Sequence, residues 1–202
     1  IAAIYRQEIT DLAAQGCTYL QIDDVPSAVL CDPRNQQIVR SRGEDPEQLI
    51  NEYFDLHNEA VRDRPAGMLL GVHLCRGNSG HGQASGGYGP IAERLFNKVD
   101  ANAYFLEYDT ERAGGFEPLR FLPKDRIAVL GILSTKLPAL EAYDEVRRKV
   151  DVAATFVDME QLCLSPQCGF SSSNLSQRFS VEEQQKKLEH LVDIASRIWG
   201  SA

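Results

Sequence analysis

Short apolar segments alternate with longer amphipathic segments along almost the whole chain, and this alternation limits the possible folds. Strands that are apolar throughout and separated by helices are typical of a parallel sheet covered on both faces. The predicted strands are Thr18–Asp23, Met68–Leu74, Ala103–Glu107, Ile127–Leu133 and Gln161–Ser165. The predicted helices are Ile1–Gln15, Glu44–Asp63, Pro90–Val99, Pro138–Val157 and Val181–Ile198. The pattern therefore predicts an α/β fold.

Two architectures fit this alternation: a doubly wound open sheet and part of a (β/α)₈ TIM barrel. No Gly-x-Gly-x-x-Gly follows the first strand, which disfavours a dinucleotide-binding sheet. Gly71 and Gly131 lie inside predicted strands, where a missing side chain suits close packing in a barrel. A complete barrel needs about 250 residues, and this chain has 202. We expect residues 1–202 to form a single domain, the C-terminal five β–α units of a barrel that extends further N-terminally.

The balance of charge excludes some classes of partner. The net charge is −8, and no block of lysine and arginine stands out, so nucleic acid and anionic membrane surfaces are poor candidates. No apolar run approaches the roughly 20 residues of a membrane span. The chain opens on a polar amphipathic stretch rather than on a signal peptide. The five cysteines form an odd set, which is typical of free thiols in a reducing compartment. We expect a cytoplasmic enzyme.

Residues capable of chemistry lie at the C-terminal ends of the predicted strands. The first strand ends at Asp23, and His73 and Cys75 end the second. Glu107 ends the third strand, and Cys168 lies just beyond the fifth. In a parallel barrel these ends share one face, where the active site is built. We therefore expect side chains distant in sequence to meet at one place.

The residue types in this set favour zinc. Side chains alternate along a strand, so the His-x-Cys pair His73 and Cys75 points to one side. Zinc binds cysteine, histidine and carboxylate groups in tetrahedral geometry. Two thiolates and a carboxylate would more than neutralise the ion, which favours activating a thiol over activating water. The alternative is that His-x-Cys arises by chance and that each cysteine is a small buried hydrophobe.

The other cysteines and two of the other histidines are expected to have structural roles or no defined role. Cys17 and Cys163 adjoin or lie within predicted strands and are expected in the core, whereas Cys31 lies in a loop. His57 lies on the apolar face of a predicted helix and His190 in the closing helix, so both are expected to be structural.

Five segments together resemble a known family. They are Tyr5–Ile9, Gln21–Asp24, His73–Asn78, Phe105–Tyr108 and Ser165–Phe170. In this order they are similar to the C-terminal barrel of cobalamin-independent methionine synthase, in the superfamily that also contains uroporphyrinogen decarboxylase. The His-x-Cys strand end together with the Pro-x-Cys-Gly segment is the most specific part of the likeness.

This resemblance implies a (β/α)₈ barrel with Zn²⁺ held by His73, Cys75, Glu107 and Cys168. It implies that Asp23 binds the amino group of homocysteine. The implied reaction moves a methyl group from 5-methyltetrahydropteroylglutamate to the homocysteine thiol, as in methionine biosynthesis. Zinc would lower the pKa of that thiol and position its sulfur.

The sequence departs from the family pattern at several places. The family has Asp-Glu-Pro after Gln-Ile, whereas this chain has Asp23-Asp24-Val25-Pro26, which puts the folate contacts of that loop in doubt. The family's proton-donating histidine falls on Leu133, and Lys136 or His81 is the candidate replacement. The glycine-rich loop Gly77–Gly89 is a candidate lid. These departures are typical of smaller, single-barrel relatives of methionine synthase.

Three functions remain open from the sequence. The first is zinc-dependent methyl transfer to homocysteine, from the folate donor or a related one. The second keeps the zinc but alkylates another thiol, such as coenzyme M. The third is a metal-free barrel, either decarboxylase-like or a binding protein, and the intact set of four ligands argues against it.

Overall fold

The computed structural model describes residues 1–77, 84–171 and 179–201. Its centre is a parallel sheet in which each strand pairs with the next strand along the chain. The strands are β1 (Tyr19–Asp23), β2 (Leu69–Leu74), β3 (Ala103–Glu107), β4 (Ile127–Leu133) and β5 (Leu162–Pro166). In a doubly wound sheet the strand order reverses at a switch point. The unbroken order from β1 to β5 therefore argues against that architecture.

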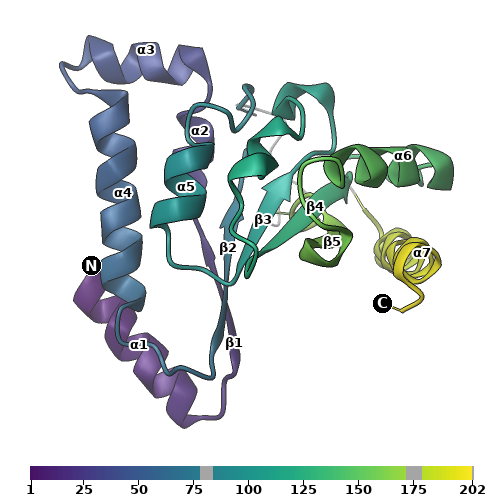
Figure 1. Cartoon of the computed structure of the whole chain (residues 1–202), viewed down its shortest axis with the longest axis horizontal. Helices are drawn as coiled ribbons and strands as arrows, with labels where there is room; N and C mark the ends of the chain where they lie inside the picture. Colours follow the sequence, from purple (N-terminus) through teal and green to yellow (C-terminus); the bar gives the residue numbers. More distant parts are fainter. Residues whose placement is uncertain (78–83, 172–178, 202) are drawn as a thin grey trace.

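Helices connect the strands and lie beside the sheet (Figure 1). The α-helices are α1 (Ala2–Ala14), α2 (Val25–Val29), α3 (Pro33–Ser41), α4 (Pro46–Val61), α5 (Ala92–Lys98), α6 (Tyr143–Ala153) and α7 (Val181–Trp199). The 3₁₀ turns are η1 (Glu111–Ala113), η2 (Glu117–Phe121) and η3 (Met159–Gln161). Among the residues in the described ranges, no helix is both long and apolar enough to cross a membrane.

The two faces of the sheet differ in burial. Side chains such as Leu70, Leu106 and Leu130 on one face are fully buried in the core beneath the helices. On the other face, Tyr19 and Leu69 at the β1 edge are exposed. The expectation that both faces are covered is therefore wrong near the β1 edge, whereas His73, Val129 and Glu107 on the same face are buried. The prediction that Cys163 lies in the core is also wrong, because it is exposed on the edge strand β5.

Aspartate side chains cap the starts of two helices in a segment that was predicted to be a loop. The Asp24 side chain accepts a hydrogen bond from the Ser27 amide at the start of α2. Asp32 accepts one from the Arg34 amide at the start of α3, with Pro33 in the first turn. The connection after β4 also differs from prediction, because α6 begins at Tyr143 rather than Pro138.

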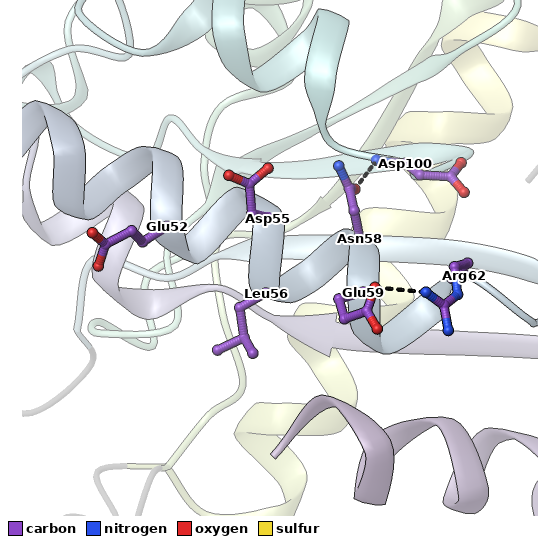
Figure 2. Close-up of a pocket in the computed structure, with 7 residues that line it drawn as sticks. All are labelled: Glu52, Asp55, Leu56, Asn58, Glu59, Arg62 and Asp100. Carbon is purple, nitrogen blue, oxygen red and sulfur yellow. Dashed lines mark hydrogen bonds and ion pairs between the residues drawn. The ribbon is translucent and has the colours of Figure 1, made fainter.

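The outward side of α4 carries acidic residues, and Figure 2 shows them around a shallow hollow with Asp100. Three of these carboxylates pair with cations, whereas Glu52 accepts a hydrogen bond from the Gln48 side chain. Asp55 lies 2.9 Å from Lys98 and Glu59 lies 3.0 Å from Arg62. Asp100 pairs with Arg64 at the edge of the same hollow. This surface is therefore a set of exposed ion pairs, each of which contributes about 0–1 kcal/mol to stability.

Candidate metal centre

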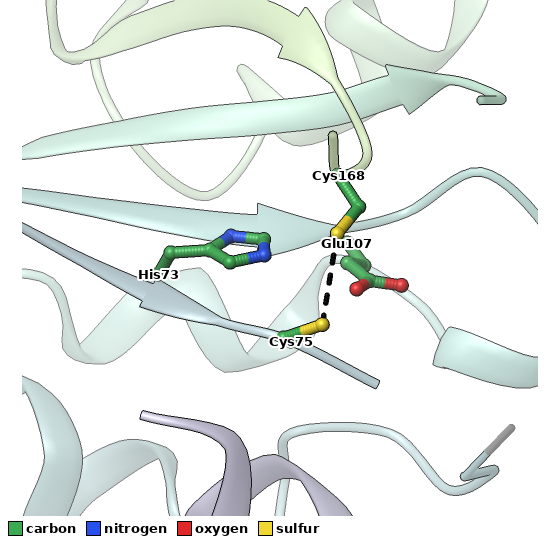
Figure 3. Close-up of side chains that lie close together, drawn as sticks. All are labelled: His73, Cys75, Glu107 and Cys168. Atoms are coloured by element: carbon green, nitrogen blue, oxygen red, sulfur yellow. Dashed lines mark hydrogen bonds between the residues drawn. The ribbon is translucent and has the colours of Figure 1, made fainter. Parts of the chain in front are cut away.

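The fold brings four predicted ligands to the C-terminal edge of the sheet. His73 lies in β2, Cys75 follows β2 directly, and Glu107 is the last residue of β3. Cys168 follows the end of β5 by two residues. One potential ligand atom from each residue lies within 4.8 Å of the others, and Figure 3 shows the side chains pointing toward one another. The expected convergence is therefore present, while metal binding stays a prediction.

The two sulfurs have a separation suited to a shared ion. The Sγ atoms of Cys75 and Cys168 lie 3.6 Å apart. Two thiolates on one tetrahedral zinc, each bound at about 2.3 Å, would lie about 3.8 Å apart. The contact between the sulfurs is the main cause that raises the pKa of Cys75, and it lowers the pKa of Cys168. One thiol therefore gives up its proton more readily than its neighbour.

The His73 side chain has an unpaired nitrogen inside this cluster. His73 is 7% exposed, and its Nε2 has no hydrogen-bond partner among the described residues. Burial lowers the pKa of His73, but the hydrogen bond with Cys75 and the charges of Asp23 and Glu107 raise it overall. A buried polar atom without a partner costs about 1–3 kcal/mol. Coordination of a metal would satisfy this atom.

Glu107 is fully buried, and both of its carboxylate oxygens accept hydrogen bonds. The Arg76 amide donates to Oε1 at 2.8 Å, and the Arg112 guanidinium donates to Oε2 at 3.0 Å. The main-chain amide of Glu107 donates to the Tyr88 hydroxyl at 2.9 Å. The Glu107 carboxylate is thus held from both sides while it faces the two thiols and the imidazole.

A second group of charges surrounds Glu107, and most of it was not predicted from the sequence. The side chain of Asp109 is 0% exposed and accepts a hydrogen bond from Lys136 at 2.7 Å. Arg112 also reaches Asp109, at 3.4 Å. The available signal was the run of charged residues that begins at Glu107, the last residue of β3, and continues with Asp109 and Arg112. Lys136 was proposed only as a proton donor, and the structure pairs it with Asp109.

Close backbone packing holds Cys168 over the sheet. A Cβ atom added to Gly131 would lie 2.8 Å from the Gln167 Cα and 2.9 Å from the Leu106 carbonyl oxygen. The Gln167 amide donates to the Leu133 carbonyl at 2.8 Å, and its side-chain oxygen accepts from the Thr135 amide at 2.7 Å. The expected close packing at Gly131 is therefore confirmed, and it places the segment that carries Cys168.

The other predicted site residues have different positions. Asp23 pairs in register with His73 and is exposed, and its charge reaches the imidazole. Leu133, the position at which the resemblance implies a proton donor, is a fully buried hydrophobic residue at the end of β4. His81 lies outside the described residues, as does part of the candidate lid. At the end of that loop, Ser85 donates to the Asp32 carboxylate at 3.0 Å and 3.1 Å.

The cysteines and histidines outside the cluster have other surroundings. Cys17 is half-buried against the smaller hydrophobic cluster, while Cys31 is buried and its pKa is raised to about 11 by burial. The Nε2 atom of His57 lies 3.2 Å from the Asp100 carbonyl, and that of His190 lies 2.8 Å from the Glu141 carbonyl. The two histidines thus contact main-chain atoms, as expected for structural residues.

The donor set fits one metal better than others. Two sulfurs, one imidazole nitrogen and one carboxylate oxygen in a compact group are typical of zinc, whereas magnesium and calcium prefer oxygen ligands. The unpaired Nε2 of His73 and the 3.6 Å separation of the sulfurs are consistent with the same ion.

Comparison with known proteins gives the same family as the sequence motifs. The model of the catalytic domain of cobalamin-independent synthase matches residues 1–197. The uncharacterized protein YxjH of Bacillus subtilis is 40% identical over 201 residues, which cover 98% of this chain and 53% of that protein. The chain therefore spans about half the length of the curated relatives it matches most fully.

Solved structures agree on the fold. The putative vitamin-B12 independent methionine synthase from Listeria monocytogenes matches with a TM-score of 0.78 and 35% identity, over 99% of this chain and 54% of that one. A B12-independent methionine synthase from Shewanella, solved in complex with selenomethionine, has a TM-score of 0.73 at 18% identity, over 98% and 52% of the two chains. On its motifs, its fold and the match over residues 1–197, this chain belongs to the catalytic-domain family of cobalamin-independent methionine synthase.

Proposed function

We propose that the protein is a zinc-dependent methyltransferase that methylates homocysteine or a similar thiol. Methionine is the product if the acceptor is homocysteine. The methyl donor is 5-methyltetrahydropteroylglutamate or a related compound. The observation that carries the proposal is the meeting of His73, Cys75, Glu107 and Cys168 within 4.8 Å, with Nε2 of His73 unpaired among the described residues.

These four side chains would hold the ion, and Asp23 would bind the amino group of the substrate. Zinc would supply a Lewis acid that keeps the substrate sulfur deprotonated at neutral pH. Asp23 is suited to its role because it is an exposed carboxylate in register with His73 on the next strand. A substrate with a thiol at one end and an ammonium group at the other would reach both.

We further propose that residues 1–202 form a single domain, which makes up the C-terminal five β–α units of a (β/α)₈ barrel. The unbroken strand order is that of a sheet wound in one direction, as barrels require. The apolar side chains exposed near the β1 edge, such as Tyr19 and Leu69, would then face the interior of the closed barrel. The five free cysteines support a reducing location such as the cytoplasm.

One observation supports a different alkyl donor or acceptor. A buried leucine, Leu133, replaces the histidine that serves the family as proton donor. A donor whose leaving group needs no proton would make that histidine unnecessary. Alkyl transfer to another thiol, such as coenzyme M, is therefore the second candidate function.

The ligand assignment is tested by the zinc content of the full-length protein and of two cysteine variants. We expect wild type to bind one zinc per chain and Cys168→Ser to lose at least about 100-fold in zinc affinity, because a thiolate ligand is lost. Cys163→Ser is the matched control, since this cysteine is exposed on β5, and it should bind zinc like wild type. Equal zinc affinity in all three proteins would refute the assignment.

The reaction is tested separately with the zinc-loaded full-length protein. We expect homocysteine to bind more tightly than thiols that lack an amino group, and Asp23→Asn to remove this preference. Formation of methionine from the methylated folate would identify the donor. Zinc binding without that product would favour the second candidate function.

A further inference from the structure

Two cations lie against the carboxylate that is a predicted metal ligand. The Arg112 guanidinium donates to Oε2 of Glu107 at 3.0 Å, and the ammonium of Lys136 lies 4.0 Å from the same oxygen. The Arg112 side chain is 16% exposed and that of Lys136 is 11% exposed, so water screens these charges weakly. The predicted metal would therefore share one carboxylate group with two cationic neighbours.

A buried carboxylate holds both cations in place. The side chain of Asp109 is 0% exposed and accepts from Lys136 at 2.7 Å and from Arg112 at 3.4 Å. The group of Arg112, Lys136 and Asp109 therefore has one net positive charge. A divalent ion bound to two thiolates, one carboxylate and a neutral imidazole has one net negative charge. The two groups compensate each other.

We propose that Arg112 and Lys136 are positioning residues that compete with the metal for Glu107 and make this carboxylate its weakest ligand. The inference depends on the proposed zinc site. A carboxylate whose oxygen already accepts a charge-assisted hydrogen bond has less negative charge to offer a metal ion. The cations also favour the arrival of a further anion, such as a substrate thiolate.

None of the other three ligands has a cation as close as Arg112 is to Glu107 in the described part of the chain, although the charge of Lys136 also acts on Cys168. The Cys75 sulfur accepts a hydrogen bond from the Gly77 amide at 3.4 Å, which is a weak contact, and Nε2 of His73 has no partner there. Each of these ligands can meet the metal without giving up an ion pair. Glu107 is thus the ligand for which cations of the chain compete most directly with the metal.

The experiment measures the zinc affinity of the full-length protein by competition with a chromophoric chelator, with Zn²⁺ alone as the probe. Arg112→Gln should bind zinc about tenfold more tightly than wild type, because a cation within a few ångströms of a bound ion is removed. Asp109→Asn should bind zinc about tenfold more weakly, because an anion is removed instead. Arg112→Lys keeps the charge and should remain within about threefold of wild type.

A matched control removes an arginine outside the centre. Arg120 lies in η2 and is exposed, and it donates to the Glu117 carbonyl at 3.2 Å, so Arg120→Gln should leave the zinc affinity unchanged. Thermal unfolding of each metal-free variant checks that it folds. If Arg112→Gln fails to fold, Lys136→Gln should show the same sign with a smaller change, since its ammonium lies farther from Glu107.

Tighter zinc binding by Arg112→Gln, or by its substitute, together with weaker binding by Asp109→Asn supports the inference. Unchanged or weaker binding by Arg112→Gln overturns it while the proposed zinc site stands. A wild-type protein that binds no zinc overturns both.

Discussion

Two buried ion-pair clusters in this protein contain the same kinds of charged residues but differ in their surroundings. In the first, Lys187 is 0% exposed and lies 3.0 Å from both carboxylate oxygens of Glu141, while it also donates to the Ala139 carbonyl. Glu141 in turn accepts from the Ser134 amide at 2.8 Å. This cluster joins α7 to the connection between β4 and α6.

The second cluster lies at the sheet edge and contains Glu107, Asp109, Arg112 and Lys136. Its charges are also paired, but it borders an imidazole nitrogen without a partner in the described ranges and two sulfurs 3.6 Å apart. All charged groups of the Glu141 cluster have partners within the chain. The Glu107 cluster, in contrast, lies beside a nitrogen and two sulfur atoms that could bind a metal ion. The first cluster therefore stabilises the fold, and the second borders the proposed metal site.

The largest expected effect on stability comes from breaking the first cluster. Lys187→Met should lower the free energy of unfolding by about 3 kcal/mol, because it leaves Glu141 without its cation in a largely buried place. Urea denaturation followed by circular dichroism measures this loss. The zinc affinity of the folded variant should equal that of wild type. A parallel loss of zinc affinity would show that the two clusters are not independent.

Substituting the glutamate of the second cluster, Glu107, should change zinc affinity rather than stability. Glu107→Gln should lower the zinc affinity by about 10- to 100-fold, since it weakens a ligand and leaves its cations in place. Glu141→Gln is the matched substitution in the first cluster and should change stability without changing zinc affinity. Chelator competition on both variants gives the comparison, and equal zinc affinities would contradict it.

The smallest expected effect concerns the Asp32 carboxylate, which links α3 to the end of the glycine-rich loop. The hydrogen bond from Arg34 is the main cause that lowers the pKa of Asp32 well below its usual value, and Ser85 lowers it further. Asp32→Asn should cost about 1 kcal/mol at neutral pH. A lowered folded-state pKa gives stability that is present above about pH 4 and lost as the pH falls further.

The difference in stability between wild type and Asp32→Asn should therefore shrink in strong acid. Thermal unfolding between about pH 7 and pH 2 measures this trend, because the range spans the ordinary pKa of an aspartate. A difference that stays constant over the whole range would show that the charge of Asp32 contributes nothing.

The sequence was sufficient for the strands and for the place where the ligands meet. β3 and β4 were predicted residue for residue, because continuous apolar runs bounded by polar residues define buried parallel strands. The convergence of His73 and Cys168 followed from strand alternation and from the common edge of parallel strands. These features depend on local pattern and on topology, which a sequence displays.

Features that depend on side-chain partners were not predicted. The Asp109–Lys136 pair joins positions 27 residues apart, and the sequence around either residue does not indicate that the other is its partner. Cys163 looked like a core residue because its strand is apolar, but β5 is an edge strand with an exposed face. The start of α6 was placed too early because the role of Glu141 in binding Lys187 is tertiary.

The close contact at Gly131 has a consequence for anyone who transplants this centre into another scaffold. The thiol of Cys168 sits where it does because a hydrogen atom, rather than a methyl group, faces the Gln167 backbone at position 131. If the four ligands were copied without that glycine, the sulfur of Cys168 would move away from the other three ligands. The grafted centre would then have three ligands instead of four.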